Sequence, residues 1–171
     1  MKRKRILAMI LAVASCLSLA ISASAANTPN RKATDFRDFD KSAWYAEAVS
    51  AAADNGLLYG KSSSIIDPNG AMTRAEMAAI INRSFGCYKA ADISQYKDVS
   101  KSKWYYKDVA LAVQMSTYNG RSSSTMAPDS PISRQEAMTV VARALELDYD
   151  AYAKTDLSAF SDRSEISNWA L

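Results

Sequence analysis

The chain has 171 residues, carries 21 basic and 18 acidic side chains and contains no histidine. The lack of histidine excludes Ser-His-Asp catalysis, Cys-His pairs and histidine-based metal sites within this chain. Four of the basic residues lie at positions 2–5, so the remainder holds 17 basic and 18 acidic residues, a net charge of −1. The sequence pI of about 8.8 therefore gives no support for a nucleic-acid or membrane partner.

Residues 1–25 have the pattern of a secretory signal peptide. A basic start precedes an apolar core at residues 6–21, and Ala23-Ser24-Ala25 forms a small-x-small cleavage site. The core is too short for a transmembrane helix. Cleavage after this site would leave Cys87 as the single thiol, whereas the alternative of lipoprotein processing would acylate Cys16. Residues 26–35 are polar, and we expect them to form a linker.

The chain repeats itself after this linker. Residues 36–86 align with residues 96–146 at a constant offset of 60 without a gap, and 15 of the 51 positions are identical. An ungapped repeat of this length predicts a repeat architecture. A third copy begins near Phe160, and its Trp169 corresponds to Trp44 of the first copy. Because the chain stops inside the next expected helix, we interpret the third copy as truncated.

Each repeat predicts a helix, a long loop and a second helix. The first helix is expected from near Ser42 to Asn55-Gly56, which can form a left-handed cap. In the second copy Met115-Ser116 stands at this position and is a weaker stop. The loop at roughly residues 57–72 is unusually long between helices, and such loops are more often functional than not.

The second helix of each repeat begins with a capping box. Thr73 and Glu76 form it in the first copy, and Ser133 and Glu136 in the second, so we expect structural roles for all four. An amphipathic run follows in each copy. Its predicted buried faces are Met77, Ile80, Ile81 and Phe85 in one helix and Val140, Val141, Ala144 and Leu145 in the other.

An arginine occupies the first helical position of both copies, at Arg74 and Arg134. The helix dipole disfavours a cation there, whereas free amides beside a guanidinium suit a carboxylate or phosphate. The arginines therefore predict contact with an anionic ligand, and Arg→Ala should weaken that contact with little loss of stability. The alternative is that each arginine pairs with an acidic side chain elsewhere in the fold.

These motifs together resemble the S-layer homology (SLH) family of bacterial surface proteins. The first copy supplies Phe36-Arg37-Asp38, Trp44-Tyr45, Gly60, Pro68 and Thr73-Arg74-Ala75-Glu76. The second supplies Tyr96-Lys97-Asp98, Trp104-Tyr105, Gly120, Pro128 and Ser133-Arg134-Gln135-Glu136. Two departures are Gln135, where the family motif has alanine, and the absence of an aromatic residue two positions before each loop proline.

The resemblance implies an all-α fold of helix-loop-helix units that form a pseudo-threefold spindle. The repeats would occupy residues 36–88 and 96–148, with an incomplete third repeat at residues 160–171. If ligand grooves lie between neighbouring repeats, at most one complete groove is expected. The fragment should be mostly helical and weakly stable.

The resemblance also implies a function. The chain would be a secreted, non-catalytic module that holds its protein to the cell wall by binding secondary cell-wall polysaccharide or another peptidoglycan-linked glycan, often with a pyruvylated sugar. We expect no cofactor, no metal, no nucleic-acid partner and no membrane contact after signal cleavage. The alternatives are an anchor region of a secreted glycoside hydrolase or protease whose catalytic domain lies beyond residue 171, or a structural S-layer subunit.

Eight residues are the candidate contacts for the wall glycan. Each also has a structural alternative, which is packing for the tryptophans, turn formation or capping for the aspartates, and loop flexibility for the glycines. The candidates are Arg74, Arg134, Trp44, Trp104, Asp38, Asp98, Gly60 and Gly120.

Overall fold

A computed structural model describes residues 31–148 and 156–170, so the predicted signal peptide, Cys16 and the start of the linker lie outside the described residues. The elements in chain order are η1 (Ala33–Asp35), α2 (Ala46–Asp54), α3 (Arg74–Phe85), α4 (Tyr106–Gln114), α5 (Arg134–Ala144), η2 (Arg163–Glu165) and η3 (Asn168–Ala170). Extended pairing in the described part is limited to one isolated bridge between Thr73 and Pro131. The predicted all-α fold is confirmed.

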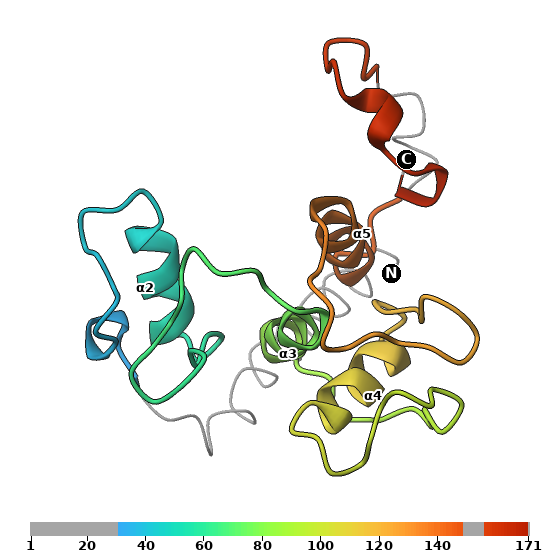
Figure 1. Ribbon diagram of the computed structural model, residues 1–171, viewed down its shortest axis with the longest axis horizontal. Helices are drawn as coiled ribbons and strands as arrows, with labels where there is room; N and C mark the ends of the chain where they lie inside the picture. Colours follow the sequence, from blue (N-terminus) through green and yellow to red (C-terminus); the bar gives the residue numbers. More distant parts are fainter. Residues whose placement is uncertain (1–30, 149–155, 171) are drawn as a thin grey trace, which may run out of the picture.

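Helix α3 lies at the centre of the described fold, with α4 on one side of it and α5 on the other (Figure 1). Helix α2 instead contacts η1, and α5 also contacts η3. The second helix of the first repeat therefore packs against the first helix of the second repeat. The core crosses the boundary between the repeats, so the two copies stabilise one another.

Small side chains allow α3 and α4 to approach closely. Ala75 and Ala78 of α3 and Ala112 of α4 are almost fully buried in one cluster, which Val109 and Val140 join. The predicted apolar face of α3 is only partly correct. The helix buries Arg74, Ala75, Ala78, Ala79, Ile81 and Asn82, whereas Phe85 is 43% exposed. The bulkier residues were predicted to face the core, but the close contact with α4 selects the alanine face.

The two predicted capping boxes are present. Thr73 Oγ1 accepts a hydrogen bond from the Glu76 amide, and Glu76 Oε2 accepts one from the Thr73 amide at 2.8 Å. Ser133 and Glu136 repeat the arrangement at the start of α5. Each pair satisfies two amides that have no partner within the helix, so the positions of these two helix starts are specified locally.

The first helix of the repeat starts later than predicted, at Ala46 instead of near Ser42. The amide and hydroxyl of Ser42 both donate to Asp40 Oδ1, which holds the preceding residues in a turn. The predicted end is correct, since Asn55 caps α2 and Gly56 has a φ of 67°. In the second repeat Ser116 adopts the same left-handed conformation, with a φ of 59°, without a glycine.

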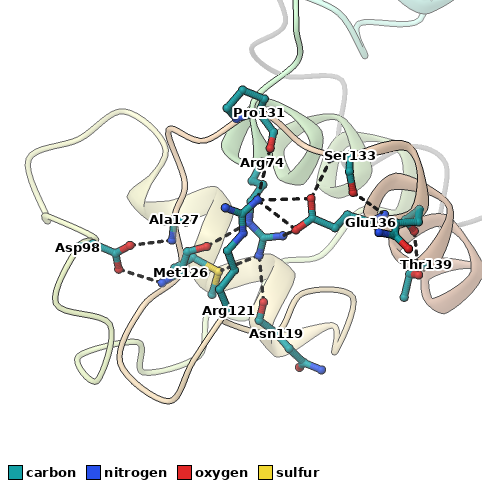
Figure 2. A network of polar contacts seen from close by, with 11 residues as sticks. Arg74, Asp98, Asn119, Arg121, Met126, Ala127, Pro131, Ser133, Glu136 and Thr139 are labelled. Atoms are coloured by element: carbon teal, nitrogen blue, oxygen red, sulfur yellow. Dashed lines mark hydrogen bonds and ion pairs between the residues drawn. The ribbon is translucent and has the colours of Figure 1, made fainter. Parts of the chain in front are cut away.

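The long loops are held in shape by the aromatic-x-Asp motif. Asp38 accepts hydrogen bonds from the amides of Ile66 and Asp67, and Asp98 does the same for Met126 and Ala127 (Figure 2). The hydrogen bond from the Ile66 amide holds the pKa of Asp38 below its usual value. These carboxylates therefore fix the loop backbone, a structural role that differs from the turn formation or capping given as their alternative.

The loop glycines are required by the same aromatic residues. A Cβ on Gly60 would lie 2.4 Å from the Phe36 ring, and a Cβ on Gly120 would lie 2.4 Å from the Tyr96 ring. Gly60 also has a φ of 80°, which disfavours other residues. Each glycine thus allows its loop to close over the aromatic residue of its own repeat.

Candidate functional site

Two cavities of similar size lie at equivalent positions in the two repeats. The first groove, of about 510 Å³, is lined by Gly60, Lys61, Glu76, Ile80, Arg83 and Trp104, among others. The second groove, of about 530 Å³, is lined by the corresponding residues Gly120, Arg121, Glu136, Val140, Arg143 and Trp169. Both volumes fall in the range of small-ligand sites. The expectation of at most one complete groove was wrong, because the start of the third repeat is enough to wall the second groove.

Each groove is completed by a tryptophan from the following repeat. Trp104 belongs to the second repeat and lines the first groove, and Trp169 belongs to the third and lines the second groove. Their exposed fractions are 60% and 55%, whereas Trp44, which lines neither groove, is 92% exposed. Trp104 also packs edge-on against Tyr105, with the ring centroids 5.4 Å apart. Each groove therefore offers an accessible indole.

The cations of the first groove are both engaged by the protein. Lys61 Nζ lies 2.6 and 2.7 Å from the two carboxylate oxygens of Glu76. Arg83 donates to the Leu57 carbonyl oxygen at 3.0 Å, and its guanidinium lies 3.8 Å from the centroid of the Tyr59 ring. Partial burial raises the pKa of Glu76, but the hydrogen bonds from Lys61 and Thr73 outweigh it and hold this pKa below its usual value.

The second groove has a different set of charges. Arg121, whose side chain is 44% exposed, lies 3.3 Å from Glu136. Within residues 31–148 and 156–170, no hydrogen bond or ion pair engages the Arg143 side chain, although it lines the same groove. The hydroxyl of Tyr118 is buried and also has no hydrogen-bond partner in this part of the chain. Burial raises the pKa of this phenol, so Tyr118 is a neutral donor at physiological pH.

Arg74 reaches from the first repeat into the second groove (Figure 2). Its guanidinium donates to Glu136 Oε1 at 2.9 Å, to the Asn119 carbonyl oxygen at 3.0 Å and to the Met126 carbonyl oxygen at 3.1 Å. It also lies over the Tyr118 ring, 5.1 Å from the centroid. Arg74 is only 5% exposed, so its cation is used to join the two repeats.

The amides at the start of α3 are used in the same way. The Arg74 amide donates to the Ser130 carbonyl oxygen and the Ala75 amide to that of Pro128. The structure therefore gives Arg74 the partner that the scaffold alternative required, an acidic side chain of the other repeat. Arg134 differs, because it is exposed and has no hydrogen bond or ion pair within the described part of the chain.

The charges around Glu136 control its ionisation. Partial burial raises its pKa, but hydrogen bonds from Ser133 and the positive charges of Arg74 and Arg121 hold the pKa below its usual value. Glu136 is therefore a carboxylate at neutral pH. It serves both the capping box of α5 and the contact between repeats.

The structure separates the predicted contact residues into two groups. Gly60 and Trp104 line the first groove, and Arg74 and Gly120 line the second. Neither groove lining includes Trp44, Arg134, Asp38 or Asp98.

Several groove residues were not singled out from the sequence. Lys61 and Arg121 occupy equivalent positions and are both basic, but they were missed because only identical residues were used to define the repeat. Tyr118 was missed because the first repeat has Leu58 at the equivalent position. Gln135, identified only as a departure from the motif, accepts a hydrogen bond from the Ser167 amide and so holds the third repeat against α5.

The described residues also bear on membrane insertion and metal binding. No helix among them is long and apolar enough to span a membrane. They also contain no group of three or more cysteine or acidic side chains placed to hold a metal ion.

Comparison with known proteins places the chain in a family. The family model of the S-layer homology domain matches residues 35–78 and 95–138, which make up more than half of the chain. The chain belongs to this family. Each matched segment overlaps one of the two repeats. The predicted resemblance is confirmed, and the matched residues form an SLH module.

The SLH module is similar to segments of much longer proteins. It is 32% identical over 158 residues to the surface-layer 125 kDa protein of Lysinibacillus sphaericus, covering 92% of this chain and 13% of that protein. It is 25% identical over 170 residues to an endoglucanase of Bacillus sp. (strain KSM-635), covering 98% of this chain and 18% of the relative. It is 26% identical over 142 residues to the exoglucanase XynX of Acetivibrio thermocellus, covering 82% and 13%. The chain thus spans less than a fifth of each of these relatives.

Proposed function

We propose that this SLH module anchors an exported protein to the bacterial cell wall by binding a wall polysaccharide in its two grooves. The observation that carries the proposal is the pair of equivalent grooves, each with an exposed tryptophan from the next repeat and a wall that contains cations. An exposed indole with polar groups nearby suits a sugar ring, which has an apolar face and a hydroxyl-bearing rim. Membership of the SLH family and the surface-layer relative support the same conclusion.

Tryptophan position is the main geometric support. Trp104 and Trp169 are partly buried where they line the grooves, whereas Trp44 lines neither groove and is 92% exposed. A glycan chain lying along both grooves would contact two indoles from one molecule. Two linked contacts raise the apparent affinity well above that of either groove, because the second contact is intramolecular. This arrangement suits a non-covalent anchor.

The individual glycan contacts are also part of the proposal. Gly60 and Gly120 bring the loop backbone close to the bound sugar, and Arg74 shapes the second groove through Glu136. Arg134 remains a candidate contact for a carboxylate of a pyruvylated sugar, since it is exposed and unpaired among the described residues. Only a glycan that extends beyond the grooves would contact Arg134, Trp44, Asp38 or Asp98, because neither groove lining includes them.

Cosedimentation with purified cell walls tests the proposal. The parent chain should pellet with Gram-positive walls that retain their secondary polysaccharide and stay in solution with walls from which it has been extracted. The double variant W104A/W169A should lose the interaction while its circular dichroism stays unchanged. Tyr88→Ala is the matched control, because Tyr88 is a 94% exposed aromatic residue outside both grooves. Equal pelleting of the double variant and the parent would count against the grooves as the binding site.

The alternative reading is that the module serves a secreted enzyme. Relatives named endoglucanase and exoglucanase contain a similar segment, and this favours a role in carrying a glycoside hydrolase. The purified 171-residue chain should then bind wall polysaccharide without releasing new reducing ends. Release of reducing ends by this chain would contradict a purely binding role.

A further inference from the structure

The contact between the two repeats has a donor side and an acceptor side. The donor side is the start of α3, where the Arg74 guanidinium and the amides of Arg74 and Ala75 donate to the second repeat. The acceptor side consists of the Glu136 carboxylate and four backbone carbonyl oxygens of the second loop. These oxygens belong to Asn119, Met126, Pro128 and Ser130. Both repeats contain both sets of positions, so this contact uses only one of two donor sides and one of two acceptor sides.

The first repeat has an acceptor side that the described part of the chain does not use. It consists of Glu76 and the positions equivalent to the four bonded carbonyls, which are Tyr59, Ile66, Pro68 and Gly70. The oxygens of these four residues accept no hydrogen bond from any described residue. The loop of the first repeat therefore presents a row of free acceptors beside a carboxylate.

The loops of the two repeats place their cations alike. Lys61 donates to Glu76 and to the Ala71 carbonyl oxygen in the first repeat. Arg121 makes the equivalent contacts in the second repeat, with Glu136 and the Pro131 carbonyl oxygen. Because Glu136 binds Arg74 and Arg121 together, the presence of Lys61 does not prevent Glu76 from taking an arginine as well.

Burial shows that the acceptor side of the first repeat is uncovered. Pro128 is buried beneath the start of α3, whereas Pro68 is half-buried and Gly70 is exposed. Pro68 and Gly70 also line the first groove, and the lining of the second groove includes neither Pro128 nor Ser130. The first groove thus continues over a stretch of loop that α3 covers in the second repeat.

The start of α5 is the matching unused donor side. Arg134 is exposed and has no hydrogen-bond or ion-pair partner in residues 31–148 and 156–170. The amides of Arg134 and Gln135 also donate to no described acceptor, in contrast to those of Arg74 and Ala75. The Gln135 side chain accepts from the Ser167 amide, and this contact leaves both backbone amides free. Arg134 and the Glu76 carboxylate have opposite charges, so the two unused sides are complementary.

We propose that two copies of the chain associate through these two sides, with Arg134 of one copy bound to Glu76 and to the Tyr59 and Ile66 carbonyl oxygens of the other. A second copy is the fitting occupant, because it carries the acceptors in the arrangement that the equivalent arginine already uses within one chain. Each copy has both sides, so two copies can exchange two identical contacts about a twofold axis.

Self-association of this kind goes beyond the proposed function and does not depend on it. The second groove keeps a volume of about 530 Å³ with Arg74 in place, so the equivalent contact leaves room for a ligand in the first groove. Association would instead occupy Arg134, which is otherwise a candidate contact for the glycan. The assembled form would thus present grooves of the same kind without this exposed cation.

The isolated β-bridge of the chain gives the register of the proposed contact. Thr73 pairs with Pro131 in an antiparallel bridge within one chain. The equivalent pair between two copies is Ser133 of one and Ala71 of the other. Facing residues of antiparallel segments have Cα atoms about 4.5–5.5 Å apart, which is within the reach of a disulfide. Cysteines at these two positions should therefore cross-link.

Disulfide trapping tests this pairing. Ala71→Cys and Ser133→Cys are prepared as separate variants, each with Cys16→Ser and Cys87→Ser so that it has one thiol. Mild oxidation of their mixture should give a heterodimer whose joined peptides are identified by mass spectrometry. Ala71→Cys mixed with Tyr88→Cys is the control, because Tyr88 is 94% exposed and belongs to neither side. Equal yields from the two mixtures would overturn the proposal.

Sedimentation measures the contribution of the ion pair. The dimer fraction of the parent should rise with protein concentration, and Arg134→Ala should raise the dissociation constant about tenfold or more. Arg134→Lys should restore part of the loss, because it keeps the charge without the planar fork. Glu76→Gln should also weaken the dimer, since it removes the charge but keeps a capping partner for α3. Lys107→Gln removes an exposed cation that belongs to neither side and should have no effect.

Two sedimentation results would contradict the proposal. One is a parent chain that stays monomeric at every concentration, and the other is an Arg134→Ala variant that associates as the parent does. Either result leaves glycan binding in the grooves standing, because cosedimentation with cell walls measures it separately. A circular dichroism spectrum of each variant that matches the parent excludes unfolding as the cause of lost association.

Discussion

Replacing Arg74 with alanine should destabilise the SLH module strongly, because its buried side chain bonds the first repeat to the second. Its guanidinium donates to one carboxylate and two backbone carbonyl oxygens of the second repeat, and its side chain is 6% exposed. Removing one partner of a buried ion pair costs about 3–5 kcal/mol. The lower end applies here, since Glu136 keeps Arg121 and the Ser133 amide as partners.

A loss of about 3 kcal/mol corresponds to a fall of roughly 10 °C in the melting temperature of a domain of this size. Arg134→Ala is the matched control, because it makes the same change at the equivalent helix position, where the side chain is exposed and unpaired among the described residues. It should shift stability by no more than about 0.5 kcal/mol. Urea unfolding and thermal melts measure both values. Equal stability of Arg74→Ala and the parent, or equal losses in the two variants, would refute the idea that Arg74 joins the repeats. The structure thus replaces, for Arg74, the sequence-based expectation of little stability loss.

Three other perturbations affect contacts described above. The pKa values of Glu76 and Glu136 are lowered in the folded state, so their contribution to stability should be complete above about pH 4.3 and be lost as the pH falls through the folded pKa values. Urea unfolding between pH 7 and pH 3 should show this decline, and a Glu136→Gln variant whose stability falls with pH as steeply as the parent's would contradict it. Gly60→Ala should cost more than about 1 kcal/mol in thermal melts, because its Cβ would meet the Phe36 ring. Gly86 also has a positive φ but lies in open space, so Gly86→Ala should cost less, and the reverse order would show that the ring contact is unimportant. Asp98→Asn should destabilise the second loop by about 1–2 kcal/mol, because it weakens the hydrogen bonds that Asp98 accepts from the Met126 and Ala127 amides. Hydrogen exchange should become faster at these two amides, and unchanged exchange would count against this role.

The parts of the fold that the sequence predicts are those specified by local interactions. The capping boxes of Thr73 and Ser133 involve residues three positions apart, so they are visible as short motifs and appear as predicted. The start of α2 was placed too early because Ser42 resembles a helix cap but bonds to Asp40 in a separate turn. A single sequence does not distinguish these two uses of a serine.

The parts that the sequence does not predict depend on contacts between repeats. The packing of α3 against α4 decides which face of α3 is buried, and no local pattern specifies that neighbour. The two uses of arginine at one motif position show the same limit. Arg74 and Arg134 have the same place in the capping motif, yet only Arg74 has a following repeat whose described loop provides acceptors.

The grooves were only partly predictable for the same reason. Gly60, Gly120 and Trp104 belong to repeated motifs and could be identified as candidates. The pairing of each groove with the tryptophan of the next repeat requires the arrangement of the repeats in space. Arg143 has no hydrogen bond or ion pair among the described residues, and its repeat has Asn119 where the first repeat has Tyr59. This difference becomes meaningful only once the contact of Arg83 with Tyr59 is known.

The central claim is that this SLH module binds glycan in two grooves. Calorimetric titration with an oligosaccharide of the wall polysaccharide is its most direct test. The oligosaccharide should contain both acidic and uncharged sugar residues. The parent chain should show saturable binding at both grooves, Trp104→Ala and Trp169→Ala should each remove one of the two binding events, and the double variant should show none while remaining helical. Undiminished binding by the folded double variant, or no binding by the parent, would contradict the account.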